Sequence, residues 1–268
     1  MYEVALIGAG NMGEAMLKGW LESGLLKASD VVVSEKDESK SRSIEERYRS
    51  GSAPDIESAT REARTLVIAV KPQDSVGVLR EVAGGADSEK TVLSIVAGLP
   101  IARIREELGP EPTVVRAMPN LAARVRAAVT AYAVDEGTEK TDRVTIEKLL
   151  GGIGEVVEVE EDLMDLVTAL SGNGPAYFFL LVEALEDAGV ERGLARDISS
   201  KLARETLWGA AKMIKETGSG AGELRAAVSS PGGTTLAALE KLERSGLAKT
   251  IDGAVGAAHK RAAELTQR

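Results

Sequence analysis

The first half of the chain alternates short, uninterrupted apolar runs with segments of helical periodicity. The apolar runs, partly β-branched, occupy residues 4–7, 31–33, 66–70, 92–95 and 114–115. Such runs are typical of parallel strands that are buried on both faces. The helical segments lie at about 12–24, 37–49, 73–82 and 100–108. This alternation predicts an α/β fold with a doubly wound, mostly parallel sheet, completed by a strand near 128–134, a helix near 138–150 and a strand at 156–159.

After about residue 160 the pattern is helical almost end to end, over 161–189, 194–217, 222–228 and 234–265. We therefore predict a Rossmann-type domain over residues 1–159 and an all-helical domain over residues 160–268. The segment 176–182 is apolar all round, so its helix should be buried on every side. A helical domain of this size seldom encloses such a helix alone. We expect a second copy of the chain to cover it, which makes this a dimerisation domain.

Composition and charge exclude several classes of function. The 268 residues include no cysteine, which rules out disulfides, thiolate metal sites and a cysteine nucleophile, and we expect no metal. The net charge of −9, with both signs interspersed, argues against a nucleic-acid partner. The sequence contains no run of 18 apolar residues, so we expect no membrane span. The first strand begins close to Met1, so we expect no targeting peptide and a cytoplasmic protein.

The motif Gly8-Ala9-Gly10-Asn11-Met12-Gly13 follows the first predicted strand and opens a helix. In a dinucleotide-binding loop the first glycine permits the tight turn, the second admits the pyrophosphate and the third allows helix to pack on strand. Glu35 lies 22 residues after Gly13, where a carboxylate can accept hydrogen bonds from the adenosine ribose. The alternative is a purely structural glycine turn. The context favours NAD(P)H as cofactor.

Glu35 also bears on the choice of cofactor. Its carboxylate would repel the 2′-phosphate of NADPH, which favours NADH, whereas Lys36 could attract that phosphate. Ligands of open α/β sheets bind beyond the carboxyl ends of the strands, so the later strand ends are included in the site. The predicted cofactor-binding residues are Ile7, Gly8, Ala9, Gly10, Asn11, Met12, Gly13, Ser34, Glu35, Lys36, Ala69, Val70, Lys71, Pro72, Val96, Ala97 and Asn120.

A second glycine-rich turn, Ser230-Pro231-Gly232-Gly233-Thr234-Thr235, opens a predicted helix more than two hundred residues downstream. Backbone N–H groups at such a turn can hold a small anion. The alternative is an ordinary helix start with Ser230 as cap and Pro231 in the first turn, although two glycines there would be costly. A cofactor site together with an anion site indicates a reductase that acts on a small carboxylate.

These motifs, with Ser171-Gly172-Asn173-Gly174-Pro175, resemble those of pyrroline-5-carboxylate reductases over essentially the whole chain. The resemblance implies hydride transfer from NAD(P)H to the C=N bond of 1-pyrroline-5-carboxylate, giving L-proline. It also implies a helical domain that interlocks with a second subunit, often within a ring of dimers. The chain departs from the usual pattern at Asn173, where the family has serine, near Ile56, where it often has asparagine, and near Gly220, where it often has His-Pro.

The resemblance also implies roles for individual residues. The turn at 230–235 would hold the substrate carboxylate through Ser230, Gly232, Gly233 and Thr234, and the catalytic hydroxyl of Thr235 would hydrogen-bond the ring nitrogen. A cyclic imine can take its proton from solution, so a strong general acid is dispensable, in keeping with a single histidine, His259. Glu161 is a further candidate for the nitrogen end of the substrate, although acidic residues at a helix start often only complement the helix dipole.

Two other functions stay open at this point. A β-hydroxyacid-type dehydrogenase has a similar opening loop but uses a catalytic lysine on the helix after the Rossmann domain, and residues 175–189 contain none. A nicotinamide-binding regulator without turnover is the second, and the intact turn at 230–235 argues against it. The sequence leaves undecided the choice between NADH and NADPH, the oligomer beyond a dimer, acceptance of six-membered imines and feedback by proline.

Overall fold

The computed structural model describes residues 1–135 and 137–267, which form two compact units. The first unit comprises Met1–Asn173 together with the end of the chain from Ala258, and the second is Gly174–Ala257. The division falls later than the predicted boundary at 159/160. Met164 explains the difference, because its buried side chain belongs to one of the two hydrophobic cores of the sheet.

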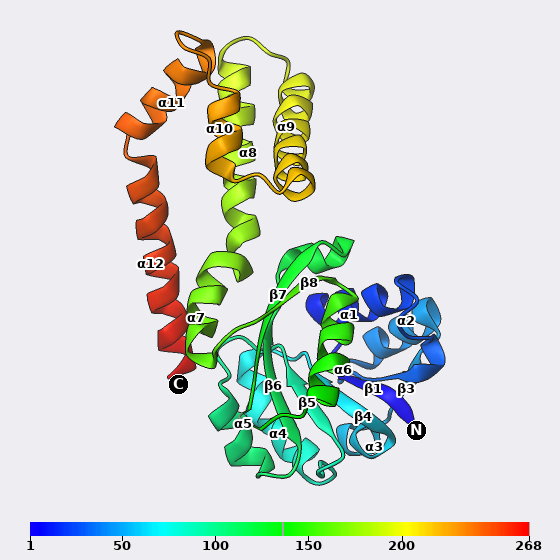
Figure 1. The fold of residues 1–268 in the computed structure, drawn as a ribbon. Coiled ribbons are helices and arrows are strands. Elements are labelled where there is room, and N and C mark those ends of the chain that lie inside the picture. Colours follow the sequence, from blue (N-terminus) through cyan, green and yellow to red (C-terminus); the bar gives the residue numbers. More distant parts are fainter. Residues whose placement is uncertain (136, 268) are drawn as a thin grey trace. The chain divides into compact units, whose positions relative to one another are not determined.

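The first unit is built on one eight-stranded sheet with the order β3-β2-β1-β4-β5-β6-β7-β8 (Figure 1). Every pairing is parallel except that between β6 and β7. β1 lies between β2 and β4, so the winding reverses there, and the predicted fold class is confirmed. The strands are β1 (Tyr2–Ile7), β2 (Val31–Ser34), β3 (Gly51–Ser52), β4 (Ala63–Ile68), β5 (Thr91–Ser94), β6 (Thr113–Met118), β7 (Ala128–Val134) and β8 (Gly154–Glu158).

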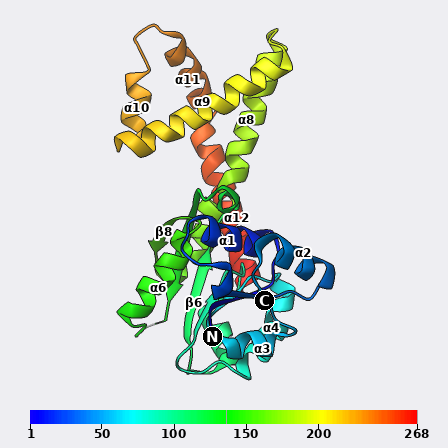
Figure 2. The same cartoon turned by 90° about the vertical axis from the view of Figure 1, so that its right-hand side faces the viewer.

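Helices cover both faces of the sheet, which explains why its strands read as continuous apolar runs (Figures 1 and 2). In β1, Val4 and Leu6 enter one core, and Ala5 and Ile7 enter the other. Helices α1 (Asn11–Glu22), α2 (Glu38–Tyr48) and α6 (Lys140–Gly151) contribute to the first core. Helices α3 (Ile56–Glu62), α4 (Ser75–Ala83) and α5 (Ile101–Leu108) contribute to the second.

Several elements differ from those predicted. β3 and α3 were not expected, because β3 is only two residues long and carries no apolar run. The helix expected over 161–189 consists of a 3₁₀ turn (Glu161–Leu163), α7 (Met164–Val167), a π-helical turn (Thr168–Gly172) and α8 (Gly174–Glu191). The helix expected over 234–265 is α11 (Thr234–Arg244) followed by α12 (Leu247–Thr266). Gly246 separates them with a φ of +78°, a left-handed conformation that a helix cannot continue through.

The second unit contains α8, α9 (Arg196–Thr217), α10 (Ala221–Ala227), α11 and the first half of α12. Figure 2 shows α9 lying against α8, where Ser199 Oγ donates to Glu186 O at 2.8 Å. Within Gly174–Ala257, all of which is described, only Gly174, Ser199 and Ala203 are buried. The unit therefore has almost no core of its own. None of the described helices is long and apolar enough to cross a membrane.

Candidate cofactor and substrate sites

The three glycines after β1 have different surroundings. Gly8 has a φ of +88°, and a Cβ on it would lie 2.8 Å from Ala69 O. A Cβ on Gly13 would lie 2.3 Å from Gly8 O. The backbone itself therefore requires glycine at both positions. A Cβ on Gly10, in contrast, would meet only Ala69 O, at 4.0 Å. The open surface at Gly10 fits the close approach of a pyrophosphate.

A cavity of about 670 Å³ adjoins this loop, at the carboxyl ends of β1, β2 and β4. Its size is typical of a cofactor site. Some predicted cofactor residues do not line the cavity. Those close in sequence to lining residues are Ala9, Asn11, Met12, Gly13 and Pro72. Those at or beyond the ends of β5 and β6 are Val96, Ala97 and Asn120. The predicted residues that line it are Ile7, Gly8, Gly10, Ser34, Glu35, Lys36, Ala69, Val70 and Lys71.

The other half of the cavity lining consists of residues that the sequence motifs do not predict. These residues follow β2, β3 and β4, or lie on α2, α3 and α4, and they are Asp37, Lys40, Pro54, Asp55, Ile56, Asp74, Gly77, Val78 and Glu81. Recognition of β3 would have identified residues 54–56 by the same strand-end rule. Ile56, where the resemblance leads one to expect asparagine, thus lies in the wall of the cavity.

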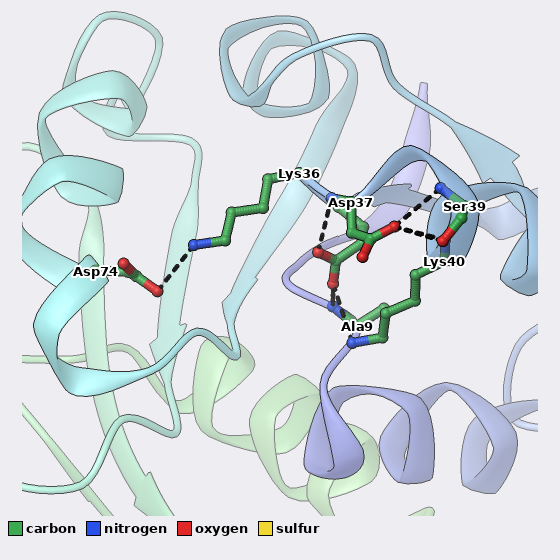
Figure 3. A network of polar contacts seen from close by, with 7 residues as sticks. Ala9, Lys36, Asp37, Ser39, Lys40 and Asp74 are labelled. Carbon is green, nitrogen blue, oxygen red and sulfur yellow. Dashed lines mark hydrogen bonds and ion pairs between the residues drawn. The ribbon is translucent and has the colours of Figure 1, made fainter.

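Glu35 is tied directly to the glycine loop (Figure 3). Its Oε2 accepts from Ala9 N at 2.9 Å, and its Oε1 accepts from Asp37 N at 3.2 Å. Lys40 Nζ lies 3.3 Å from Oε2. Burial opposes ionisation of Glu35, but the two amides and the ammonium group outweigh it, so the pKa of Glu35 lies below its ordinary value. At neutral pH a carboxylate therefore lies at the end of β2, in the wall of the cavity.

Lys36 extends from the end of β2 toward the start of α4 (Figure 3). Its Nζ lies 3.2 Å from Asp74 Oδ2. The Lys36 side chain is 80% exposed, so this ion pair contributes little to stability. The ion pair does place the carboxylate of Asp74 beside Lys36, the residue predicted from the sequence to attract a 2′-phosphate.

Asn120 and Glu161 have partners within the first unit. Asn120 Nδ2 donates to Ser171 O at 3.2 Å, and its Oδ1 accepts from Ala122 N at 3.2 Å. Glu161 Oε1 accepts from Ile101 N at 2.6 Å, so it caps α5. These bonds give both side chains a structural role. Contact of Asn120 with the cofactor, or of Glu161 with the substrate, stays a prediction.

The turn at 230–235 lies in the second unit. α11 begins at Thr234, and its N-cap is Gly233, so the ordinary start with Ser230 as cap is not formed. Gly232 adopts a φ of +69°. Gly233 N donates to Ser230 O at 3.0 Å, which uses one of the amides predicted to hold an anion. The first amides of α11, from Thr234 onward, have no acceptor within their own helix and suit a small anion.

The fold and the cavity together define a dinucleotide-binding protein of the Rossmann class. No group of residues able to hold a metal ion occurs in the described part of the chain. A family model described as pyrroline-5-carboxylate reductase dimerisation matches residues 161–265, and one described as NADP oxidoreductase, coenzyme F420-dependent, matches residues 3–98. The chain belongs to the pyrroline-5-carboxylate reductase family, as full-length relatives show.

Two such relatives carry the name pyrroline-5-carboxylate reductase. The protein from Mycobacterium tuberculosis is 40% identical over 99% of this chain and 97% of its own length, and that from Synechocystis is 38% identical over 99% of each. A solved pyrroline-5-carboxylate reductase from Coxiella burnetii is 32% identical, with a TM-score of 0.94 over 99% of this chain and 98% of that one. The structure from Plasmodium falciparum, solved with NADP bound, is 29% identical, with a TM-score of 0.88 over 99% and 98% of the two chains. The resemblance is confirmed, and the β-hydroxyacid-type alternative is set aside.

Proposed function

We propose that this chain reduces the C=N bond of 1-pyrroline-5-carboxylate with NAD(P)H and forms L-proline. The observation that carries the proposal is identity of 38–40% to named pyrroline-5-carboxylate reductases over 99% of the chain. The glycine loop and its cavity fit the cofactor, because Gly10 leaves open the surface that a pyrophosphate needs. When bound, the reduced nicotinamide supplies the hydride.

The residues of the chain bind and orient the reactants. The first amides of α11 hold the substrate carboxylate at a helix N-terminus. The hydroxyl of Thr235, which is half-buried, orients the ring nitrogen by a hydrogen bond. Its ionised form is far too basic for Thr235 to serve as a general acid, and the imine nitrogen takes its proton from solution. Positioning therefore supplies much of the acceleration.

NADH is the preferred cofactor in this proposal. Glu35 lies at the end of β2 as a carboxylate, where it accepts hydrogen bonds from a ribose diol and repels a 2′-phosphate. Asp74 pairs with Lys36 and Glu35 pairs with Lys40, two of the lysines that line the cavity. A 2′-phosphate would have to compete with Asp74 for Lys36 and would also face the charge of Glu35.

The first test is an assay of the purified protein with 1-pyrroline-5-carboxylate and either NADH or NADPH, followed by nicotinamide absorbance. We expect turnover with a higher kcat/KM for NADH. Glu35→Gln should shift the ratio of the two kcat/KM values toward NADPH by about ten-fold, since a charge repulsion of about 1.4 kcal/mol is removed.

Glu38→Gln is the matched control, because Glu38 is an exposed glutamate on the neighbouring helix and should leave the ratio unchanged. A flat trace with both cofactors would refute the reductase and favour the non-catalytic regulator. Turnover with a higher kcat/KM for NADPH would refute only the NADH preference.

We infer that the chain is a homo-oligomer, at least a homodimer, formed through the second unit. The family model for dimerisation covers this unit, in which only Gly174, Ser199 and Ala203 are buried. Phe178 and Phe179 are 54% and 56% exposed in the single chain. Light scattering should give a mass of at least twice 28.1 kDa, whereas a monomer at micromolar concentration would refute the inference. A ring of dimers, a cytoplasmic location and the lack of nucleic-acid or membrane partners stay predictions.

A further inference from the structure

The C-terminal end of α12 lies directly against the loop that follows β5. Gly98 in this loop has a φ of +72°, and a Cβ on it would lie 3.2 Å from Leu265 Cβ and 3.3 Å from the carbonyl carbon of Leu265. Two segments more than 160 residues apart in sequence are therefore packed so closely that a Cβ at Gly98 would make an unusually tight contact with α12. Glycine satisfies both the left-handed backbone and the close approach.

A chain of polar contacts joins the same end of α12 to the far side of this loop. Thr266 Oγ1 donates to Asp165 Oδ1 at 2.8 Å, and Arg116 Nη2 donates to the same oxygen at 3.0 Å. Arg116 Nη1 lies 3.5 Å from Glu161 Oε1, which accepts from Ile101 N at 2.6 Å. Ile101 is the first residue of α5. The loop at 95–100 is thus bounded by Leu265 at Gly98 and by the Glu161 contact at Ile101.

The Arg116 side chain at the centre of these contacts is only 5% exposed. Its charge is matched by two carboxylates, so the contacts are geometrically fixed rather than loose surface pairs. Thr266 and Leu265 come from the part of α12 that belongs to the first unit. The whole arrangement therefore lies within that unit.

The position of the loop gives these contacts a functional meaning. A doubly wound sheet consists of two halves, and each half of the sheet binds one mononucleotide of the dinucleotide. The ligand lies beyond the carboxyl ends of the strands. By this rule the cavity at β1 and β2 would take the adenosine half. The loop after β5 belongs to the other half, which faces the nicotinamide.

We propose that Leu265 and Thr266, the C-terminal contact pair, are positioning residues that hold the loop at 95–98 in place for the nicotinamide half of the cofactor. This inference rests on the proposed function, since it assigns a determinant of NAD(P)H binding. Neither residue lines the cavity. It acts through Gly98 and, by way of Asp165 and Arg116, through the start of α5.

Leu265→Gly, which removes the Cβ that packs on Gly98, and Thr266→Val test the proposal in the full-length protein. Leu265 is 42% exposed, and Asp165 keeps its bond to Arg116 in Thr266→Val, so both variants should fold. We expect each to weaken binding of NADH by about five-fold, as for one contact that orders a loop, and to lower kcat. Binding of ADP-ribose, which lacks the nicotinamide ring, should be unchanged.

Thr250→Val is the matched control, since Thr250 lies on the same helix and its hydroxyl donates to Gly246 O, just before the helix begins, and not to the first unit. It should change neither Kd. Calorimetry supplies the Kd of ADP-ribose, and nicotinamide fluorescence supplies that of NADH. Equal weakening of both ligands, or no change in either, would overturn the positioning role. If the unaltered protein bound neither ligand, the proposed function itself would fail.

Discussion

Replacing Gly10 by alanine is expected to weaken NADH binding by at least about ten-fold while leaving the fold intact, a loss of about 1.4 kcal/mol or more. The physical reason is that a methyl group at Gly10 meets no protein atom closer than 4.0 Å, and the φ of −60° suits alanine. The same methyl group would occupy the surface over which the pyrophosphate must approach. Titration of nicotinamide fluorescence measures the Kd, and thermal unfolding measures the stability.

Two further glycine variants make this result specific. Gly84→Ala is the control, because Gly84 is exposed, has a φ of −65° and lies outside the cavity lining, so binding should not change. Gly13→Ala should instead destabilise the protein, since its Cβ would lie 2.3 Å from Gly8 O. Retention of wild-type NADH affinity in Gly10→Ala would show that the cofactor does not pass over this loop.

Replacing Thr235 by alanine is expected to lower kcat/KM for 1-pyrroline-5-carboxylate by about ten-fold or more. One oriented hydrogen bond to the ring nitrogen is lost, which corresponds to about 1.5 kcal/mol. Thr235 is half-buried at the start of α11, beside the amides proposed to hold the carboxylate. Steady-state kinetics at saturating NADH measure the effect, and the Kd of NADH should stay at its original value.

Thr235→Ser should restore most of the activity, because it keeps the hydroxyl group. Thr234→Ala is the control within the same turn, since Thr234 is exposed and contributes its backbone amide rather than its hydroxyl. If Thr235→Ala had unchanged kinetics, Thr235 would have no part in the mechanism, although the anion site at the amides of α11 could still operate.

The cofactor loop shows how far local sequence patterns reach. The spacing of its glycines predicted a turn, an open surface and a helix contact, and the structure gives Gly8, Gly10 and Gly13 those three surroundings. Glu35 was predicted from its distance to this loop, and its carboxylate accepts the amide of Ala9. The backbone geometry of the loop is predictable because strand, turn and helix follow one another directly in the chain. Contact of Glu35 with the adenosine ribose stays a prediction.

Other features depend on contacts that no local pattern reveals. β3 is too short to produce an apolar run, and only its pairing with β2 in the structure identifies it as a strand. Residues 54–56, which follow β3 and line the cavity, could therefore not be predicted from the sequence. The splitting of the last helix rests on the left-handed backbone of Gly246, one glycine among 28 in the chain. A single glycine seldom reveals from sequence alone which conformation it adopts.

By itself the sequence determined the class of fold, the dinucleotide loop and the presence of a second glycine-rich turn at the start of a helix. Each of these depends on periodicity or on spacing within a short segment. Only the tertiary structure decided which side chains are already engaged. It paired Asn120 with Ser171, Glu161 with Ile101, and Leu265 with Gly98. Such pairs join positions 50 to more than 160 residues apart, and their partners are selected by the packing of whole helices on the sheet.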